Sequence, residues 1–166
     1  MDDVSSFNDF KQAIIGACRQ DTAMSPQTWS QDNPTDGHCG LAACLVQEVY
    51  GGEIVVAHFN GPHGGGTHFF NILPNDERFD ATSDQFGPCV TFTPPLSASN
   101  DALRENTDTF LNERGGDSMR KLMFGKESFT RRYEAIKSRL PEMFPPKQGP
   151  KTGGSLKKGG LSGPQQ

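Results

Sequence analysis

The sequence lacks a basic excess, a long apolar run and a paired-cysteine motif, and each absence excludes a class of protein. Its 166 residues carry 16 basic and 20 acidic side chains, a formal net charge of -4. A dedicated nucleic-acid binder needs a clustered basic face, so we expect no nucleic-acid partner. Apolar runs such as 54–57 are far shorter than the roughly 18 residues that span a bilayer, so we expect no membrane partner either.

The four cysteines, Cys18, Cys39, Cys44 and Cys89, show no CxxC spacing. The first residues also lack the basic and apolar regions of a secretory signal, which favours a reducing, cytoplasmic location with free thiols. Cys18, Cys44 and Cys89 lie in apolar segments, and we interpret these three as small core residues.

Length and composition predict a single folded domain over residues 1–144. Apolar residues together with glycine, with tyrosine left out, make up about 43% of the chain, slightly below the average of about 45–50% for globular proteins. Residues 145–166 are rich in Pro, Gly, Lys, Ser and Gln, and this composition predicts a disordered tail.

The hydrophobic pattern predicts helices first, a small antiparallel sheet second and helices last, which is an α+β fold. Helices are predicted at 7–19, 39–50 and about 127–140, with a loop and then a helix within 97–112. Strands are predicted at 53–59, 67–73, 78–82 and 88–92, with turns at 61–66 and 74–77. The expected helix caps are Ser5 and Ser6 for the first helix and Thr35 or Asp36 for the second.

Cys39 is the candidate nucleophile because it lies in the first turn of the predicted second helix. Unpaired backbone N–H groups and the positive end of the helix dipole favour an anion at this position, and a thiolate is such an anion. Gly37 and Gly40 flank the cysteine and would let the backbone turn sharply and a substrate approach closely. The alternative role for Cys39 is that of a small buried hydrophobic residue.

His68 is the candidate base because it opens a predicted strand just after the glycine run. Asp80 follows the next turn and is the acid that would hold the imidazole and fix its tautomer. A connection with an odd number of residues would place Asp80 on the face of His68, and an even number would place it with Asn71 on the other face. The alternative role for Asp80 is to cap Thr82 or Asp84.

A metal site is the alternative interpretation for the histidines, because His58, His63 and His68 recur every five residues. Glycine-containing runs separate the three, and this spacing is not that of ligands on one element, so we expect no metal. The run Gly64–Gly66 has no phosphate-binding context and is interpreted as a surface turn or a lid over the site. No cofactor is expected.

Motifs along the chain together resemble the bacterial YunG-like family. They are Trp29…Asn33-Pro34-Thr35-x-Gly37-x-Cys39-Gly40-x-Ala42-Ala43, Gly51-Gly52-Glu53-Ile54, His68-Phe69-Phe70-Asn71-x-Leu73, Asp80-x-Thr82-x-x-Gln85-Phe86 and the closing Arg132-Tyr133…Ile136…Arg139-Leu140. The resemblance covers about residues 25–140 and has two departures. His38 stands where the family usually has glutamine, and Asp76 stands where glycine is common.

That family is similar to the papain-like and transglutaminase-like superfamily, whose members have a helix-borne cysteine, a strand-borne histidine and an acid in this chain order. The resemblance implies a papain-like fold in which N-terminal helices pack on a small antiparallel sheet. It also implies that Cys39 is the nucleophile, His68 the base and general acid, and Asp80 the orienting group. The backbone N–H of Cys39 is expected to bind the oxyanion.

Five further residues are expected to bind the oxyanion or the substrate. Asn33 is a candidate oxyanion amide, by analogy with a glutamine that papain-like enzymes often keep at this place. His38 could compete as a base, and Trp29 is expected to cover the core or to line the substrate groove. Asn71 and Gln85 complete the set, and Gln85 is also expected to bond the backbone of its loop.

These residues predict a thiol enzyme that attacks an amide, isopeptide or thioester carbonyl, forms an acyl-enzyme and releases the acyl group to water or an amine. A cysteine peptidase, a deamidase and a transglutaminase-like enzyme share this chemistry, and the sequence favours none of them. The expected substrate is a protein or peptide. The alternative is a non-catalytic protein-binding module on the same fold.

Overall fold

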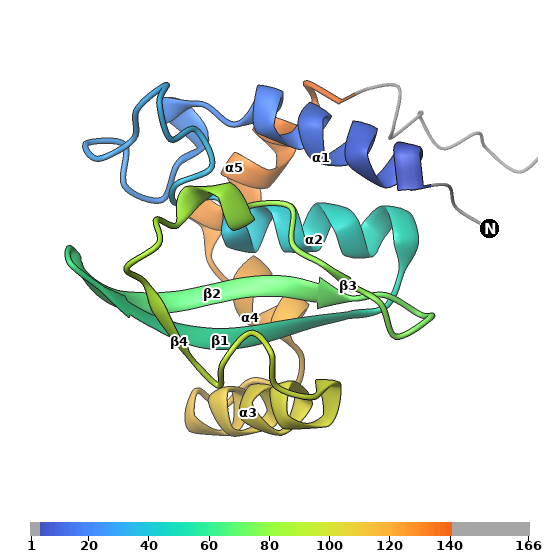
Figure 1. Cartoon of the computed structure of the whole chain (residues 1–166). Helices are drawn as coiled ribbons and strands as arrows, with labels where there is room; N and C mark the ends of the chain where they lie inside the picture. Colours follow the sequence, from blue (N-terminus) through green and yellow to red (C-terminus); the bar gives the residue numbers. More distant parts are fainter. Residues whose placement is uncertain (1–3, 141–166) are drawn as a thin grey trace, which may run out of the picture.

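A four-stranded antiparallel sheet in the order β3-β2-β1-β4 lies at the centre of the chain, with helices around it (Figure 1). The computed structural model describes residues 4–140. The α+β class and the order of helices, sheet and helices are confirmed. The predicted tail at 145–166 and the predicted domain end at residue 144 lie outside the described residues.

The helices are α1 (Val4–Ala17), α2 (Cys39–Tyr50), α3 (Asn100–Glu113), α4 (Met119–Phe124) and α5 (Glu127–Lys137), with short 3-10 turns η1 (Gln20–Thr22) and η2 (Ser83–Gln85). The strands are β1 (Glu53–Gly61), β2 (Gly64–Ile72), β3 (Arg78–Phe79) and β4 (Thr91–Thr93). Helix α4 was not predicted, and β3 and β4 are shorter than predicted. Ser5 and Ser6 lie within α1 and are therefore not its caps.

The glycine run forms part of a long hairpin, which corrects its interpretation as a turn or lid. Strands β1 and β2 pair without interruption as far as Gly61 and Gly64, so the chain turns only at positions 62 and 63. A Cβ at Gly65 would lie 2.7 Å from the carbonyl oxygen of Phe59, which leaves no room for a side chain. The glycines therefore allow the two strands to pair closely.

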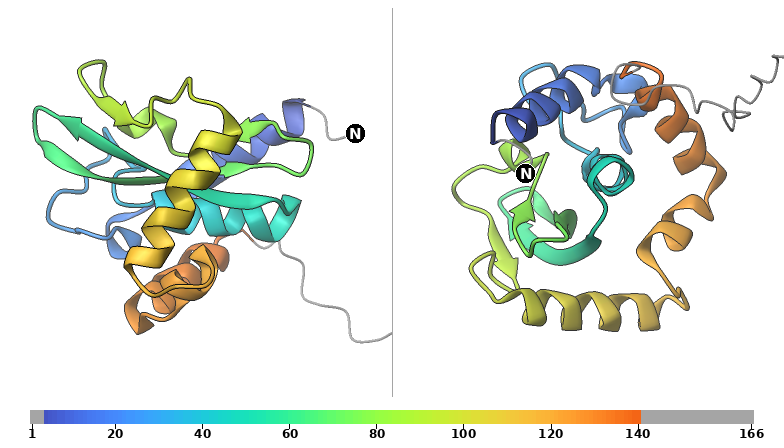
Figure 2. Two further views of the ribbon diagram at one scale, coloured as in Figure 1. Left: turned by 90° about the horizontal axis from the view of Figure 1, so that it is seen from below. Right: turned by 90° about the vertical axis from the view of Figure 1, so that its right-hand side faces the viewer.

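Helix α2 is the centre of the main core. Its residues Leu41–Val46 are all buried, as expected for a helix that is apolar on every side. Viewed along its axis, α2 is surrounded by the other helices and the sheet (Figure 2, right). On the other face of the sheet, a smaller core is made by Val55, Ala57, Phe70 and Ile72 with Leu103 of α3.

Helix α3 covers the edge of β1 that β4 leaves unpaired (Figure 1). Strand β4 pairs only with residues 58–60 of β1. The backbone N–H of Val56 instead donates to Oγ1 of Thr107 at 3.0 Å, and its carbonyl accepts from Nδ2 of Asn106 at 2.8 Å. Side chains of α3 thus make the hydrogen bonds with β1 that the backbone of a neighbouring strand would otherwise make.

Replacing Thr107 by valine should lower the free energy of unfolding by about 1–3 kcal/mol, because it keeps the side-chain shape but leaves the buried N–H of Val56 unpaired. Thr107 is only 7% exposed. Urea unfolding followed by circular dichroism measures the effect. The control is Thr109→Val on the same helix, whose exposed hydroxyl bonds the carbonyl of Glu105, with an expected change within about 0.5 kcal/mol. Equal shifts in the two variants would contradict the prediction.

Candidate active site

Cys39 is the first residue of α2, as predicted. The N-cap is His38, and no side chain makes a capping hydrogen bond, so Thr35 and Asp36 are not the cap. Gly37 precedes the helix with a φ of +76°, the left-handed conformation that favours glycine. The thiol is half-buried, and its Sγ lies 3.9 Å from the carbonyl oxygen of Thr67, the residue before His68.

His68 and Asp80 lie on the same face of the sheet and are hydrogen-bonded. The pair Ile72 and Arg78 closes a connection of five residues, 73–77, and this odd number places Asp80 on the face of His68, which the sequence had left open. Nε2 of His68 donates to Oδ2 of Asp80 at 2.6 Å. Oδ1 of Asp80 accepts from the backbone N–H of Thr82 at 3.2 Å, so its alternative role as a cap is present too and helps to fix the carboxylate.

The imidazole of His68 is 0% exposed. It stacks on Phe70, with ring centroids 5.5 Å apart, and meets the edge of Phe86 at 4.7 Å. Because Nε2 bonds Asp80, Nδ1 is the ring nitrogen left over, and it is buried with no hydrogen-bond partner of standard geometry within residues 4–140. Burial lowers the pKa of His68, but the Asp80 carboxylate and the Cys39 thiol raise it by more, to about 9. A raised pKa favours the protonated form of the ring, so a proton that leaves the thiol can be held on Nδ1 while Nε2 stays bonded to Asp80.

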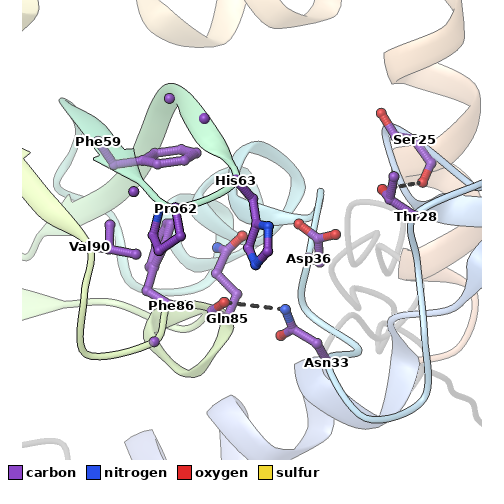
Figure 3. A pocket seen from close by; sticks show the side chains of 14 residues that line it. Ser25, Thr28, Asn33, Asp36, Phe59, Pro62, His63, Gln85, Phe86 and Val90 are labelled. Atoms are coloured by element: carbon purple, nitrogen blue, oxygen red, sulfur yellow. Dashed lines mark hydrogen bonds between the residues drawn. The ribbon is translucent and has the colours of Figure 1, made fainter.

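Two cavities lie in this part of the molecule. The first has a volume of about 510 Å³, and Cys39, Gly37 and Thr67 are part of its wall. The second has a volume of about 690 Å³, and Figure 3 shows Asn33, Asp36, His63 and Gln85 around it. The thiol thus opens into the first cavity, whereas the polar amides line the second.

The structure does not place Asn33 in the cavity of Cys39, which corrects its expected role as the oxyanion amide. Its Nδ2 donates to the backbone carbonyl of Gln85 at 3.2 Å (Figure 3). The side chain of Gln85 donates to Oγ1 of Thr82 at 3.0 Å, so its partner is a hydroxyl and not the loop backbone. Both residues hold together the loops that surround Asp80.

His38 is a structural residue and does not compete for the proton of the thiol. Its ring is 0% exposed, with Nε2 hydrogen-bonded to Oγ1 of Thr22 at 2.8 Å and Nδ1 donating to the carbonyl of Asp36 at 3.0 Å. Burial lowers its pKa, so the ring is neutral. The expectation of a substrate-binding or competing role for His38 was wrong because both nitrogens are already used.

Asn71 and Trp29 also have structural roles. Asn71 is 1% exposed and its Nδ2 donates to the carbonyl of Ala43 at 2.9 Å, which ties β2 to α2. The indole N–H of Trp29 donates to the carbonyl of Pro34 at 2.8 Å and fastens its own loop. Trp29 lines neither of the two cavities, so neither residue meets a substrate there.

All four thiols are free. Cys18 and Cys44 are buried as predicted, and burial raises the pKa of each to about 12. Cys89 is exposed, which corrects its interpretation as a core residue.

Within residues 4–140 no group of three or more His, Cys, Asp or Glu side chains is arranged for a metal, so His58, His63 and His68 do not converge. In the same range, no helix combines the length and apolar character that crossing a membrane requires.

Sequence reasoning missed the residues that shape the cavity of Cys39. Met24 comes from the loop before α2, and Arg114, Lys126 and Arg132 come from the C-terminal helical region. These residues are about 15 to 90 positions away from the cysteine and carry no motif of their own. Only the packing of α4 and α5 beside α2 brings them together.

A family model described as YunG protein matches residues 6–114. The chain is 27% identical over 84 residues to the uncharacterized protein YunG of Bacillus subtilis (strain 168), an alignment that covers 51% of this chain and 69% of that protein. No solved structure matches. The family match includes α1 and ends before α4 and α5, whereas the sequence motifs suggested a range of about 25–140.

Proposed function

The chain belongs to the YunG protein family, and we propose that it is a thiol-dependent hydrolase or acyl transferase of papain-like fold. Cys39, His68 and Asp80 form its catalytic triad, and an amide, isopeptide or thioester bond is its target. Two observations carry the proposal: Nδ1 of His68 is buried and lacks a partner of standard geometry within the described residues, and the Cys39 thiol interacts with the same imidazole and raises its pKa.

The two buried histidines of the chain support this assignment by their contrast. In His38 both ring nitrogens are hydrogen-bonded and burial lowers the pKa, as expected for a histidine with a structural role. In His68 one nitrogen is bonded to Asp80 and the other is left over, while the pKa is raised. A buried polar atom without a hydrogen bond lowers the stability of the fold by about 1–3 kcal/mol. A role in proton transfer with the thiol explains why the protein keeps such an atom.

The geometry supports a two-step acyl transfer. The thiol of Cys39 gives its proton to Nδ1 of His68, and the sulfur then bonds to the carbonyl carbon of the substrate. The backbone N–H of Cys39 donates to the oxyanion of the tetrahedral intermediate. As the carbonyl re-forms, the bond to the leaving group breaks and the imidazolium of His68 gives its proton to that group.

The second step returns the enzyme to its first state. Water or an amine attacks the thioester carbonyl and gives a proton to His68, which passes it to the departing sulfur. Asp80 holds Nε2 throughout and stabilises the imidazolium. A cysteine at a helix start, a histidine on a strand and an acid after the next turn is the arrangement of papain-like enzymes, which supports the fold proposed here.

Acylation by p-nitrophenyl acetate tests this function. We expect the intact protein to gain one acetyl group on Cys39, with release of p-nitrophenolate, and we expect Cys39→Ala to abolish this fast reaction. Cys89→Ala is the matched control, because it removes an exposed thiol that lines neither cavity and should leave the rate unchanged. Equal acetylation of the two cysteines in the native protein would favour the alternative, a non-catalytic binding module.

A further inference from the structure

We propose that the cavity beside Cys39 binds the acyl part of the substrate, and that this acyl part is an apolar chain carrying an anionic group. The inference deepens the proposed function, because the same cavity would present the acyl carbonyl to the thiol. It rests on the walls of the cavity, on its charges and on the contrast with the second cavity.

The walls of the cavity are mainly apolar. Its volume of about 510 Å³ lies within the usual range of small-molecule sites, about 300–1,000 Å³. Aromatic and sulfur-containing or aliphatic side chains line it, among them Phe69, Phe110, Met119, Leu122, Met123 and Phe129. Met24, which also lines it, is 71% exposed, more than any other large hydrophobic residue within residues 4–140. Burial of these side chains against an apolar chain would be favourable.

The charged side chains of the cavity are all basic. Arg114, Lys126 and Arg132 line it, and no Asp or Glu does, although the chain as a whole has a net charge of -4. Arg132 donates to the carbonyl of Thr22 at 3.3 Å, and burial and the neighbouring charge of Arg131 lower its pKa. An anion in the cavity would relieve this crowding of positive charge.

The partners of the other two cations leave them available to a ligand. Arg114 lies over the ring of Phe110 at 3.6 Å and meets the exposed Glu113 at 3.7 Å. Lys126 is exposed and makes no ion pair within residues 4–140. Carboxylate and phosphate groups are the anions that such side chains bind.

The second cavity has the opposite character. Asp36, His63 and the amides of Asn33 and Gln85 surround it, and none of its lining residues is Lys or Arg (Figure 3). Neighbouring residues of the segment before the thiol line the two cavities, since Asp36 lines one and Gly37 the other. An anionic acyl group therefore has one cavity that suits it, and that cavity contains Cys39.

Protection of Cys39 from iodoacetamide tests the binding without requiring turnover. Sodium hexanoate and hexylammonium chloride differ only in the group at the end of a similar chain. At ten times its dissociation constant, hexanoate should slow labelling of Cys39 about 10-fold, while hexylammonium at the same concentration should slow it less than about 2-fold. Labelling of the exposed Cys89 in the same sample should not change. Equal protection by the two ions would overturn the proposal.

Substitutions then test which cations are responsible. The double variant Arg114→Met/Lys126→Met should lose most of the preference for hexanoate over hexylammonium. The matched control is Lys121→Met/Arg131→Met, which removes the same charge from two exposed residues that do not line the cavity and should keep the preference. A preference that survives in the first variant would contradict the proposed ligands.

A pair of esters separates this inference from the proposed function. The mono-p-nitrophenyl ester of adipic acid carries a terminal carboxylate, and p-nitrophenyl hexanoate does not. We expect the former to acylate Cys39 about 10-fold faster, a difference of roughly 1.4 kcal/mol. If hexanoate protects Cys39 but neither ester acylates it, the enzyme proposal fails and the binding site stands. If both esters acylate Cys39 equally fast, the enzyme stands and the preference for an anion fails.

Discussion

Replacing His68 by alanine should slow the alkylation of Cys39 by iodoacetamide at pH 6.5 by about 10-fold or more. An ordinary cysteine, with a pKa of about 8.5, is only about 1% thiolate at this pH, and the thiolate is the reactive form. In the native protein, the unpartnered Nδ1 of His68 beside the sulfur can hold the proton of the thiol. Without the imidazole, the proton stays on sulfur and the reaction is slow.

Peptide mass spectrometry over time measures this rate at each cysteine. His63→Ala is the matched control, because it removes another histidine near the tip of the same hairpin and should leave the rate at Cys39 unchanged. Because the His68 ring is buried, His68→Gln is used as a second variant that fills more of the space, and circular dichroism checks that both are folded. A rate at Cys39 equal to that at the exposed Cys89, with or without His68, would contradict the triad.

Replacing Asp80 by asparagine should lower the pKa of His68 from about 9 to 6.5 or below. Burial alone lowers this pKa, and the Asp80 carboxylate is the main group that opposes it. At pH 8 the ring would then be neutral and unable to protonate the leaving group, so kcat/KM should fall by roughly 100-fold or more. The asparagine oxygen can still accept from the N–H of Thr82, so the local loop should be kept.

The same substitution should change how stability depends on pH. Because the folded pKa of His68 lies above its ordinary value of 6.5, its contribution is fully present below pH 6.5 and is lost as the pH rises through about 9. The difference corresponds to about 3 kcal/mol. The native protein should therefore lose stability between pH 6 and pH 9.5, and Asp80→Asn should lose much less.

Two measurements check these expectations. Proton NMR of the His68 ring follows its titration, and urea unfolding at the two pH values gives the free energies. Asp84→Asn is the control, because it removes a 65% exposed carboxylate of the same loop, 3.6 Å from Lys11, and should change neither curve. A flat stability curve in the native protein over this range would contradict the raised pKa of His68.

Local patterns in the sequence were sufficient for the position of the nucleophile. Helix α2 begins at Cys39 and ends at Tyr50 as predicted, since apolar residues fill it and glycines bound it. Gly51 and Gly52 have φ values of +79° and +84°, and a Cβ at Gly52 would lie 2.3 Å from the carbonyl oxygen of Ile72. These are local requirements of the backbone that glycine meets, so the end of the helix can be predicted from the residue types alone.

The position of Asp80 depended on one residue of the connection after β2. The sequence predicted a four-residue turn at 74–77, whereas the connection has five residues, 73–77, and this odd length places Asp80 on the side of His68 because side chains alternate along a strand. The predictions for β3 and β4 were less accurate and α4 was not predicted, since short elements depend on their neighbours. Strand β4 is short because α3 takes its place beside Val56, and nothing local to residues 88–92 indicates that.

The sequence by itself therefore determined that Cys39 begins a helix and that His68 lies on a strand of the sheet. The side of the sheet on which Asp80 lies was left open by the sequence, and the tertiary structure decided it and placed Asp80 just after β3. Only the tertiary structure decided that His38 is fully hydrogen-bonded while His68 keeps a ring nitrogen for the thiol, and that Asn33 faces another cavity. It also decided that three cations surround the cavity of Cys39. The physical reason is that helix starts and strand alternation are local, whereas hydrogen-bond partners and cavity walls come from residues that meet only when the chain is packed.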